Sequence, residues 1–167
     1  MSTELAAVGY ISDAELAGKP GVPSQARRAK GPVAVIECIQ LIPCNPCETS
    51  CKAEAINVGN DITALPKLDE DKCIGCYTCV AVCPGQAIFV VDESLEGDLA
   101  TVAMPYEFLP LPEKGEKVIA LDRSGAELGE VEVARVTTSK RMDQTAMVVI
   151  KAPKQWSMTA RAFRLKR

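Results

Sequence analysis

The spacing of its cysteines constrains this chain of 167 residues more than any other feature of the sequence. The segment CIGCYTCVAVCP separates four cysteines by two, two and three residues and ends in Pro84. Three cysteines upstream repeat the last three of this run at a constant offset of 32, whereas Cys38 stands three residues before its expected position, which Leu41 holds. The two runs comprise Cys38, Cys44, Cys47 and Cys51, and Cys73, Cys76, Cys79 and Cys83.

The clustering of these cysteines indicates metal binding rather than disulfides. The N-terminus, MSTELAAVGYISDAELAGK, is acidic and lacks the basic-then-apolar pattern of a secretory signal. No apolar run reaches the length of about 18 residues that is needed to cross a bilayer. We therefore expect a cytoplasmic protein without a transmembrane segment, a setting in which disulfides are rare.

Iron–sulfur clusters suit the spacing better than zinc. Zinc also binds four cysteines, but a zinc ribbon uses two separated pairs. Gaps of two residues instead let one tight loop aim three cysteines at a single cubane cluster. The chain contains no histidine, which excludes Rieske centres, His-ligated haem and the Ser–His–Asp and Cys–His arrangements.

The second run, with its trailing Cys-Pro, resembles that of bacterial ferredoxins with two 4Fe–4S clusters, and the similarity covers about residues 33–92. In that family the fourth cysteine of a run ligates the other cluster. The resemblance implies that Cys38, Cys44, Cys47 and Cys83 hold one cluster, and that Cys73, Cys76, Cys79 and Cys51 hold the other. It also implies clusters without an open coordination site, which conduct electrons and do not catalyse.

Two departures from the family pattern concern the first run. Five residues, including Pro43, separate Cys38 from Cys44 where the pattern has two. A wider loop can still deliver a thiolate, so we expect a full 4Fe–4S cluster. The alternative is a site with three strong ligands that binds a 3Fe–4S or labile cluster. Lys52 follows Cys51 where a proline follows Cys83, which alters the exit from the loop but not the ligand.

The segment GPVAVIECIQLIPCNPCETSCKAEAI, followed by CIGCYTCVAVCPGQAI and a β-rich tail, is similar to the small iron–sulfur subunit of multi-subunit flavin-dependent dehydrogenases. That group oxidises proline, hydroxyproline, opines or sarcosine-like amines. The resemblance implies a non-catalytic subunit that relays single electrons between flavins, or between a flavin and an external acceptor. FAD or FMN would be held on partner flavoprotein subunits of a hetero-oligomer, not on this chain.

Other functions stay open at this point. The chain could be a free two-cluster ferredoxin shuttle, or the iron–sulfur subunit of another redox complex such as a hydrogenase or an oxoacid oxidoreductase. A further alternative is that the clusters only stabilise the fold of a binding module and do not transfer electrons. The net charge of −3 argues against nucleic acid as the main partner.

Apolar runs and prolines divide the chain into four parts, with an expected fold class of α+β. Residues 1–32, which include AGKPGVPSQARRAKGP, predict an extended N-terminal arm, either disordered or laid across a partner. Residues 33–92 predict a bacterial ferredoxin-like two-cluster domain. Residues 93–112 predict a proline-containing connector that packs on the chain's own domains or docks a partner. Residues 113–167 predict a small all-β docking module, a barrel or sandwich, with a basic C-terminus.

Local patterns predict the elements within these parts. Short strands are expected at 33–37, 55–58, 63–68, 87–91, 146–153 and 159–166. A hairpin is expected with Gly125 in its turn, and a helix is expected at 13–17, capped by Ser12. In the last strand, Ala160, Ala162 and Phe163 are expected to face inward. Gly75 and Gly85 are expected to let the backbone approach the clusters. Residues 140–167 carry eight Lys or Arg and one acid, a basic tail that is either solvated or docks an acidic partner or anionic surface.

Overall fold

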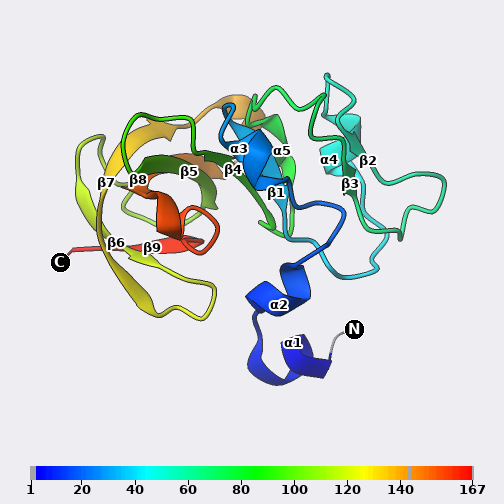
Figure 1. Cartoon of the computed structure of the whole chain (residues 1–167), viewed down its shortest axis with the longest axis horizontal. Coiled ribbons are helices and arrows are strands. Elements are labelled where there is room, and N and C mark those ends of the chain that lie inside the picture. The colour runs from blue at the N-terminus through cyan, green and yellow to red at the C-terminus, as the bar shows by residue number, and fades with distance from the viewer. Residues whose placement is uncertain (1–2, 143, 167) are drawn as a thin grey trace.

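Strands from both halves of the chain pair into one open antiparallel sheet in this computed structural model, which describes residues 3–142 and 144–166 (Figure 1). The strand order is β1-β4-β5-β8-β7-β6-β9. These strands are β1 (Val33–Ile36), β4 (Ile88–Asp92), β5 (Leu99–Tyr106), β6 (Lys117–Leu121), β7 (Glu127–Thr137), β8 (Ala146–Pro153) and β9 (Ala162–Leu165). A second, two-stranded sheet pairs β2 (Ile56–Asn57) with β3 (Lys67–Leu68).

The helices are short and lie outside the sheet. They are α1 (Thr3–Val8), α2 (Asp13–Leu16), α3 (Gln25–Arg28), α4 (Pro46–Thr49) and α5 (Thr78–Val82), with 3-10 turns η1 (Lys140–Met142) and η2 (Lys154–Trp156). The helix predicted at 13–17 is confirmed as α2, where Ser12 and Glu15 form a reciprocal capping box. None of the described helices is long and apolar enough to cross a membrane.

Most predicted strands are confirmed, and the hairpin of β6 and β7 turns at Gly125 with a φ of 85°. The strands around 55–58 and 63–68 are shorter than expected, with two paired residues each. The expectation that Ala162 faces inward is wrong: Ala162 is exposed and Phe163 is buried. Neighbouring residues of a strand point to opposite faces, so the two cannot both face the core.

Strand β5 lies inside the predicted connector and joins the two halves of the sheet. It pairs with β4, and it pairs with β8 along its whole length from Leu99 to Tyr106. The strands after residue 113 therefore continue the sheet that β1 and β4 begin, where a separate barrel or sandwich was expected. The prolines misled the expectation because Pro105 lies next to the end of the strand, and the other two prolines follow it.

The central strands are buried on both faces, which accounts for apolar runs such as IFVV and AMVVI. One face packs against the curled β6, β7 and β9, and its core includes Val91, Val102 and Ile150. The other face packs against the cysteine loops, and its core includes Val90 and Val149 together with Cys47, Cys79 and Val80. The cysteines are thus part of a hydrophobic core.

The N-terminal arm is laid across the chain's own body from Ile11 onward. Ile11 and Leu16 are buried, and the Ile36 N–H donates to the Gly21 carbonyl at 2.9 Å. A Cβ at Gly21 would lie 2.6 Å from the Ile36 Cβ, so only glycine permits this approach. The arm therefore covers the free edge of β1, which would otherwise expose unpaired backbone groups.

Candidate metal centres

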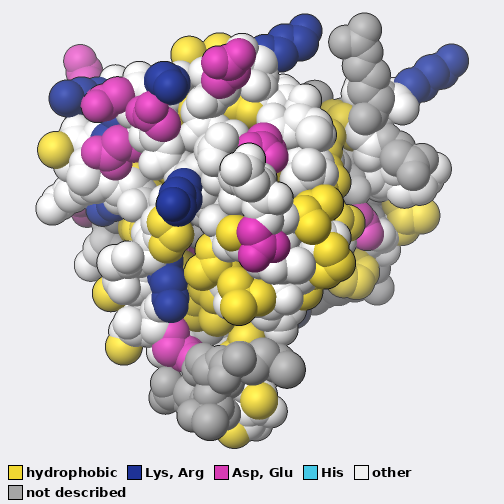
Figure 2. Space-filling view, turned by 90° about the vertical axis from the view of Figure 1, so that its right-hand side faces the viewer, with side chains coloured by type: hydrophobic (Ala, Val, Ile, Leu, Met, Phe, Trp, Pro, Cys, Tyr) yellow, Lys and Arg dark blue, Asp and Glu magenta, His cyan; other side chains and the backbone are white. Residues whose placement is uncertain are grey.

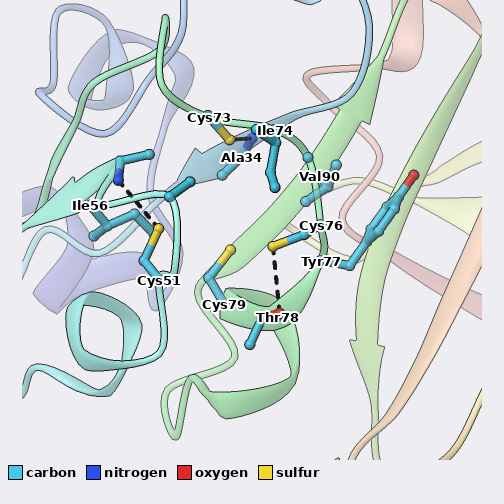
Figure 3. A pocket seen from close by; sticks show the side chains of 13 residues that line it. Ala34, Cys51, Ile56, Cys73, Ile74, Cys76, Tyr77, Thr78, Cys79 and Val90 are labelled. Atoms are coloured by element: carbon cyan, nitrogen blue, oxygen red, sulfur yellow. Dashed lines mark hydrogen bonds between the residues drawn. The ribbon is translucent and has the colours of Figure 1, made fainter.

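Two cavities on the helical side of the sheet are each lined by four cysteines. The first, here the Cys73 cavity, contains Cys51, Cys73, Cys76 and Cys79 (Figure 3). The second, here the Cys44 cavity, contains Cys38, Cys44, Cys47 and Cys83. Each cavity thus collects three cysteines of one run and the last cysteine of the other. These sets coincide with the two ligand sets that the ferredoxin resemblance implies, while ligation itself stays a prediction.

The donor set fits a cluster with several irons. Within the described residues, no group of three or more Cys, Asp or Glu side chains is arranged to hold one metal ion. A cubane cluster distributes its four thiolates over the irons, so its ligands need not meet at one point. The cavity walls are mostly apolar, with residues such as Ala34, Ile56 and Val90 around the Cys73 cavity.

Two of the thiols are buried beside other thiols. Burial, and then the neighbouring Cys83, raise the pKa of Cys47 to about 11. Burial, and then Cys73 and Cys76, raise the pKa of Cys79 to about 12. Such thiols resist ionisation on their own, whereas coordination to a metal deprotonates a thiol outright. The raised pKa values thus describe the thiols without a bound metal, and a bound cluster would hold the same sulfurs as thiolates.

The two runs fold alike, as the offset of 32 residues predicts. Helices α4 and α5 begin at equivalent positions, Pro46 and Thr78. The N–H of Ala55 donates to the Cys51 Sγ at 3.3 Å, and the N–H of Ala87 donates to the Cys83 Sγ at 3.4 Å. Cys51 and Cys83 each line the cavity that holds three cysteines of the other run. Their sulfurs therefore receive the same backbone hydrogen bond, which stabilises a thiolate.

Further hydrogen bonds reach the Cys73 cavity (Figure 3). The Ala34 N–H on β1 donates to the Cys73 Sγ at 3.4 Å, and Cys76 Sγ lies 3.5 Å from the Thr78 hydroxyl. Gly75, with a φ of 62°, packs so tightly that a Cβ there would lie 2.5 Å from the Pro32 carbonyl oxygen. A Cβ at Gly75 would thus collide with Pro32, whereas no chain atom lies within 4 Å of a Cβ at Gly85. The expectation that these two glycines let the backbone approach the clusters stays a prediction.

The widened loop after Cys38 carries exposed apolar side chains. Leu41 is 72% exposed and Ile42 is 44% exposed. Ile42 also lines the Cys44 cavity, so it lies between that cavity and solvent. Figure 2 views the side of the molecule that carries α4, β2 and β3, and apolar side chains gather in the middle of this face. The loop thus brings an apolar surface next to the sulfurs.

A buried ion network adjoins Cys38, and no pattern in the sequence signals it. The carboxylate of Glu37 binds Arg123 at 2.6 Å and Arg161 at 2.7 Å. Burial acts to raise the pKa of Glu37, but the hydrogen bonds and charges of the two arginines hold it below its ordinary value. Burial lowers the pKa of Arg161 to about 10, so the guanidinium stays charged at neutral pH. Arg123 also binds Asp13, which joins the arm, the loop and the sheet.

Three basic residues of the C-terminal tail are paired within the chain. Arg161 lies in this network, Arg164 binds Glu127 at 2.5 Å, and Lys166 binds Glu130 at 2.5 Å. Both acidic partners lie on β7. Part of the positive charge of the tail is therefore offset by acids of its own sheet.

Comparison with known proteins supports iron–sulfur chemistry in the second run. Residues 66–89 match the 4Fe–4S binding domain, a segment that contains Cys73, Cys76, Cys79 and Cys83. The match supports 4Fe–4S binding and an electron-transfer role, and it leaves the number of clusters open. No solved structure matches the chain at a significant level.

Three curated proteins are similar over the cysteine-rich region. A subunit of the ion-translocating oxidoreductase complex of Methanosarcina acetivorans is 41% identical over 61 residues, 36% of this chain and 22% of that protein. A subunit of the Na(+)-translocating ferredoxin:NAD(+) oxidoreductase complex of Acetobacterium woodii is 40% identical over 50 residues, 30% of this chain and 14% of that protein. An Escherichia coli protein named provisionally as an oxidoreductase is 37% identical over 65 residues, 39% of this chain and 9% of that protein. The chain thus spans less than a quarter of the length of these relatives.

Proposed function

We propose that this chain is the electron-transfer subunit of a flavin-dependent amino-acid or amine dehydrogenase complex, in which it holds two 4Fe–4S clusters. The observation that carries the proposal is the presence of two cavities, each lined by four cysteines from both runs. When bound, each cluster exchanges one electron at a time, which suits a flavin that receives two electrons together. The names of the two relatives from oxidoreductase complexes support a place in a multi-subunit oxidoreductase.

The residues of this chain bind and shield the redox groups. The cysteines supply the ligands, the N–H groups of Ala34, Ala55 and Ala87 stabilise the sulfurs, and buried side chains such as Val80 and Val90 exclude water. Helices α4 and α5, one from each run, contact each other, so the two cavities are neighbours. Such an arrangement suits electron transfer through two cluster sites in series.

Exposed apolar side chains support a permanent place in a complex. Phe108 is 72% exposed and Leu109 is 84% exposed, in the loop that follows β5. Of the two roles expected for this segment, these exposed side chains favour docking, although the Phe108 ring also contacts Tyr106 edge-on. We infer that residues 33–92 form the cluster-binding unit, and that residues 93–112 and 113–167 dock partner flavoproteins that carry FAD or FMN in the cytoplasm.

A second candidate is the iron–sulfur subunit of a different redox complex. The similarity to subunits of ion-translocating and ferredoxin:NAD(+) oxidoreductase complexes favours it. The two candidates differ in the reductant: a dehydrogenase complex reduces the clusters with an amine or amino acid, whereas the alternative does not. The proteins that co-purify with the chain therefore separate them.

The test is anaerobic purification of the native chain with its partners. We expect flavin-containing subunits, and bleaching of the cluster absorbance when an amine or amino acid such as proline is added. A matched pair of surface variants tests docking: Leu109→Ser should weaken co-purification at unchanged iron content, and Val8→Ser, at a 51% exposed valine in α1, should not. A chain recovered alone and monomeric would contradict the proposal. Flavin-free partners, or clusters that no amine reduces, would favour the second candidate.

A further inference from the structure

Arg27, in α3 of the N-terminal arm, is held against the loop that carries Cys73. Its Nη2 donates to the Cys73 carbonyl oxygen at 2.6 Å and to the Pro32 carbonyl oxygen at 3.2 Å. Its Nη1 donates to the Gly31 carbonyl oxygen at 3.0 Å, and its Nε donates to the Glu70 carbonyl oxygen at 2.8 Å. The planar guanidinium is therefore fixed by four hydrogen bonds beside a cysteine of the Cys73 cavity.

All four acceptors of Arg27 are neutral backbone carbonyls. Among the described residues, no carboxylate lies within salt-bridge distance of Arg27, and the Glu70 carboxylate instead accepts hydrogen bonds from the Ser24 N–H and hydroxyl. The situation beside Cys38 is different, because Arg123 and Arg161 share the carboxylate of Glu37 and Arg123 also binds the carboxylate of Asp13. The Cys73 cavity thus has beside it a cation without a salt bridge, opposed only by the more distant charge of the Glu70 carboxylate, whereas the charges beside the Cys44 cavity are paired.

A second cation contacts a residue that lines the same cavity. The guanidinium of Arg135 lies 4.7 Å from the ring centroid of Tyr77, which lines the Cys73 cavity. A shift in the register of β7 between Val133 and Arg135 accompanies this contact. Asn45 holds the position equivalent to Tyr77 in the first run and offers no ring for such a contact.

A fixed positive charge favours the reduced form of a cluster, which carries one more negative charge than the oxidised form. Asp69, Asp71 and Lys72 also lie near Cys73 in sequence, but they are exposed and salt screens them. The half-buried Glu70 opposes the charge of Arg27, but its carboxylate is bound by the N–H and hydroxyl of Ser24. Arg27 is half-buried and bound to the loop itself, so its charge is screened less. The asymmetry between the two cavities therefore favours reduction at the Cys73 cavity.

We propose that Arg27 is a positioning residue for electron transfer, which gives the Cys73 cavity the higher reduction potential of the two sites. An electron shared between the sites then rests at the Cys73 cavity. This inference rests on the proposed two-cluster function, and it assigns the site at which a single electron rests inside the chain.

The test is a redox titration of the full, iron-loaded chain, followed by electron paramagnetic resonance. Arg27→Gln should lower the higher of the two midpoint potentials and leave the lower one in place. Arg27→Lys keeps the charge and should restore most of the shift. The control is Arg164→Gln, which removes an exposed arginine from β9, at the opposite edge of the sheet from β1. This control should leave both midpoints unchanged.

Each outcome decides the inference. A shift of the lower midpoint, an equal shift of both, or equal effects of Arg27→Gln and Arg27→Lys would overturn it. If Arg27→Gln fails to load the Cys73 cavity, Cys51→Ser serves instead: loss of the higher midpoint supports the inference, and loss of the lower midpoint overturns it. A wild-type chain with a single titrating cluster would contradict the proposed function itself, so the two failures are distinguishable.

Discussion

Glu54 and Gln86 lie 32 residues apart and share a left-handed backbone conformation, with φ of 51° and 50°. Each is the third residue after the last cysteine of its run, and each donates its N–H to that cysteine's carbonyl, at 3.0 and 3.1 Å. The next N–H then donates to the cysteine sulfur, as at Ala55 and Ala87. The left-handed residue thus reverses the chain so that a backbone dipole faces the sulfur.

The first prediction concerns this left-handed position. Gln86→Gly should leave stability unchanged or raise it by up to about 1 kcal/mol, because glycine enters this region without a Cβ clash. Gln86→Val should cost about 1–2 kcal/mol, because a β-branched residue is strained there. Denaturant-induced loss of the cluster absorbance measures both, with the exposed Gln25→Val in α3 as the control for a valine in ordinary helical backbone. Equal effects of the glycine and valine variants would refute the role of the conformation.

A second prediction compares two glycines next to the cysteine runs. Gly75→Ala should disrupt the Cys73 cavity, because its Cβ would collide with the Pro32 carbonyl and its φ is positive. Gly85→Ala meets no chain atom within 4 Å and should bind iron normally. Iron content and the visible spectrum of the two purified variants are the measurements. Full iron loading of the Gly75→Ala protein would show that the loop can move away from Pro32.

The third prediction tests the exchange of cysteines between the runs. Cys83→Ser should damage the site built on Cys44 and Cys47, and Cys51→Ser should damage the site built on Cys76 and Cys79. Iron should fall from about eight to about four atoms per chain in each variant, with loss of one resonance signal. The two variants are matched, since each removes the last cysteine of a run. If Cys83→Ser selectively removes the cluster of its own run, the assignment is wrong.

A fourth prediction concerns the buried network next to Cys38. Glu37→Gln should cost about 3–5 kcal/mol, because it leaves Arg123 and Arg161 buried without their shared carboxylate. The control is Glu127→Gln, which removes an exposed pair with Arg164 and should cost at most about 1 kcal/mol. Unfolding of the iron-loaded variants by denaturant gives both values. Similar losses in the two variants would mean that the network adds little.

The sequence predicted best what its local spacing determines. The offset of 32 residues indicated the shared local fold of the runs, and the alternating residues around Gly125 indicated the hairpin. The grouping of Cys51 with Cys73 followed from the family resemblance, and the structure lines the cavities with the same sets.

The rest depends on contacts between distant residues. Pairing of β5 with β8 brings together residues about 47 apart, and three prolines near β5 suggested a connector instead. Glu37 and Arg161 are separated by 124 positions, and a lone charged residue in the sequence is normally solvated. The arm looked unfolded because its glycines and prolines break helices, yet Gly21 serves a close contact with Ile36.

The continuous sheet also limits how far this protein can be shortened. A fragment that ends at residue 92 keeps all eight cysteines but leaves β4 as an uncovered, largely apolar edge, a template for aggregation. A shortened form of this chain that is meant to carry electrons must therefore retain β5 and β8, or carry charged residues on the edge of β4 that their loss exposes. The smallest expressible unit is thus set by backbone pairing, and not by the extent of the cysteine motif.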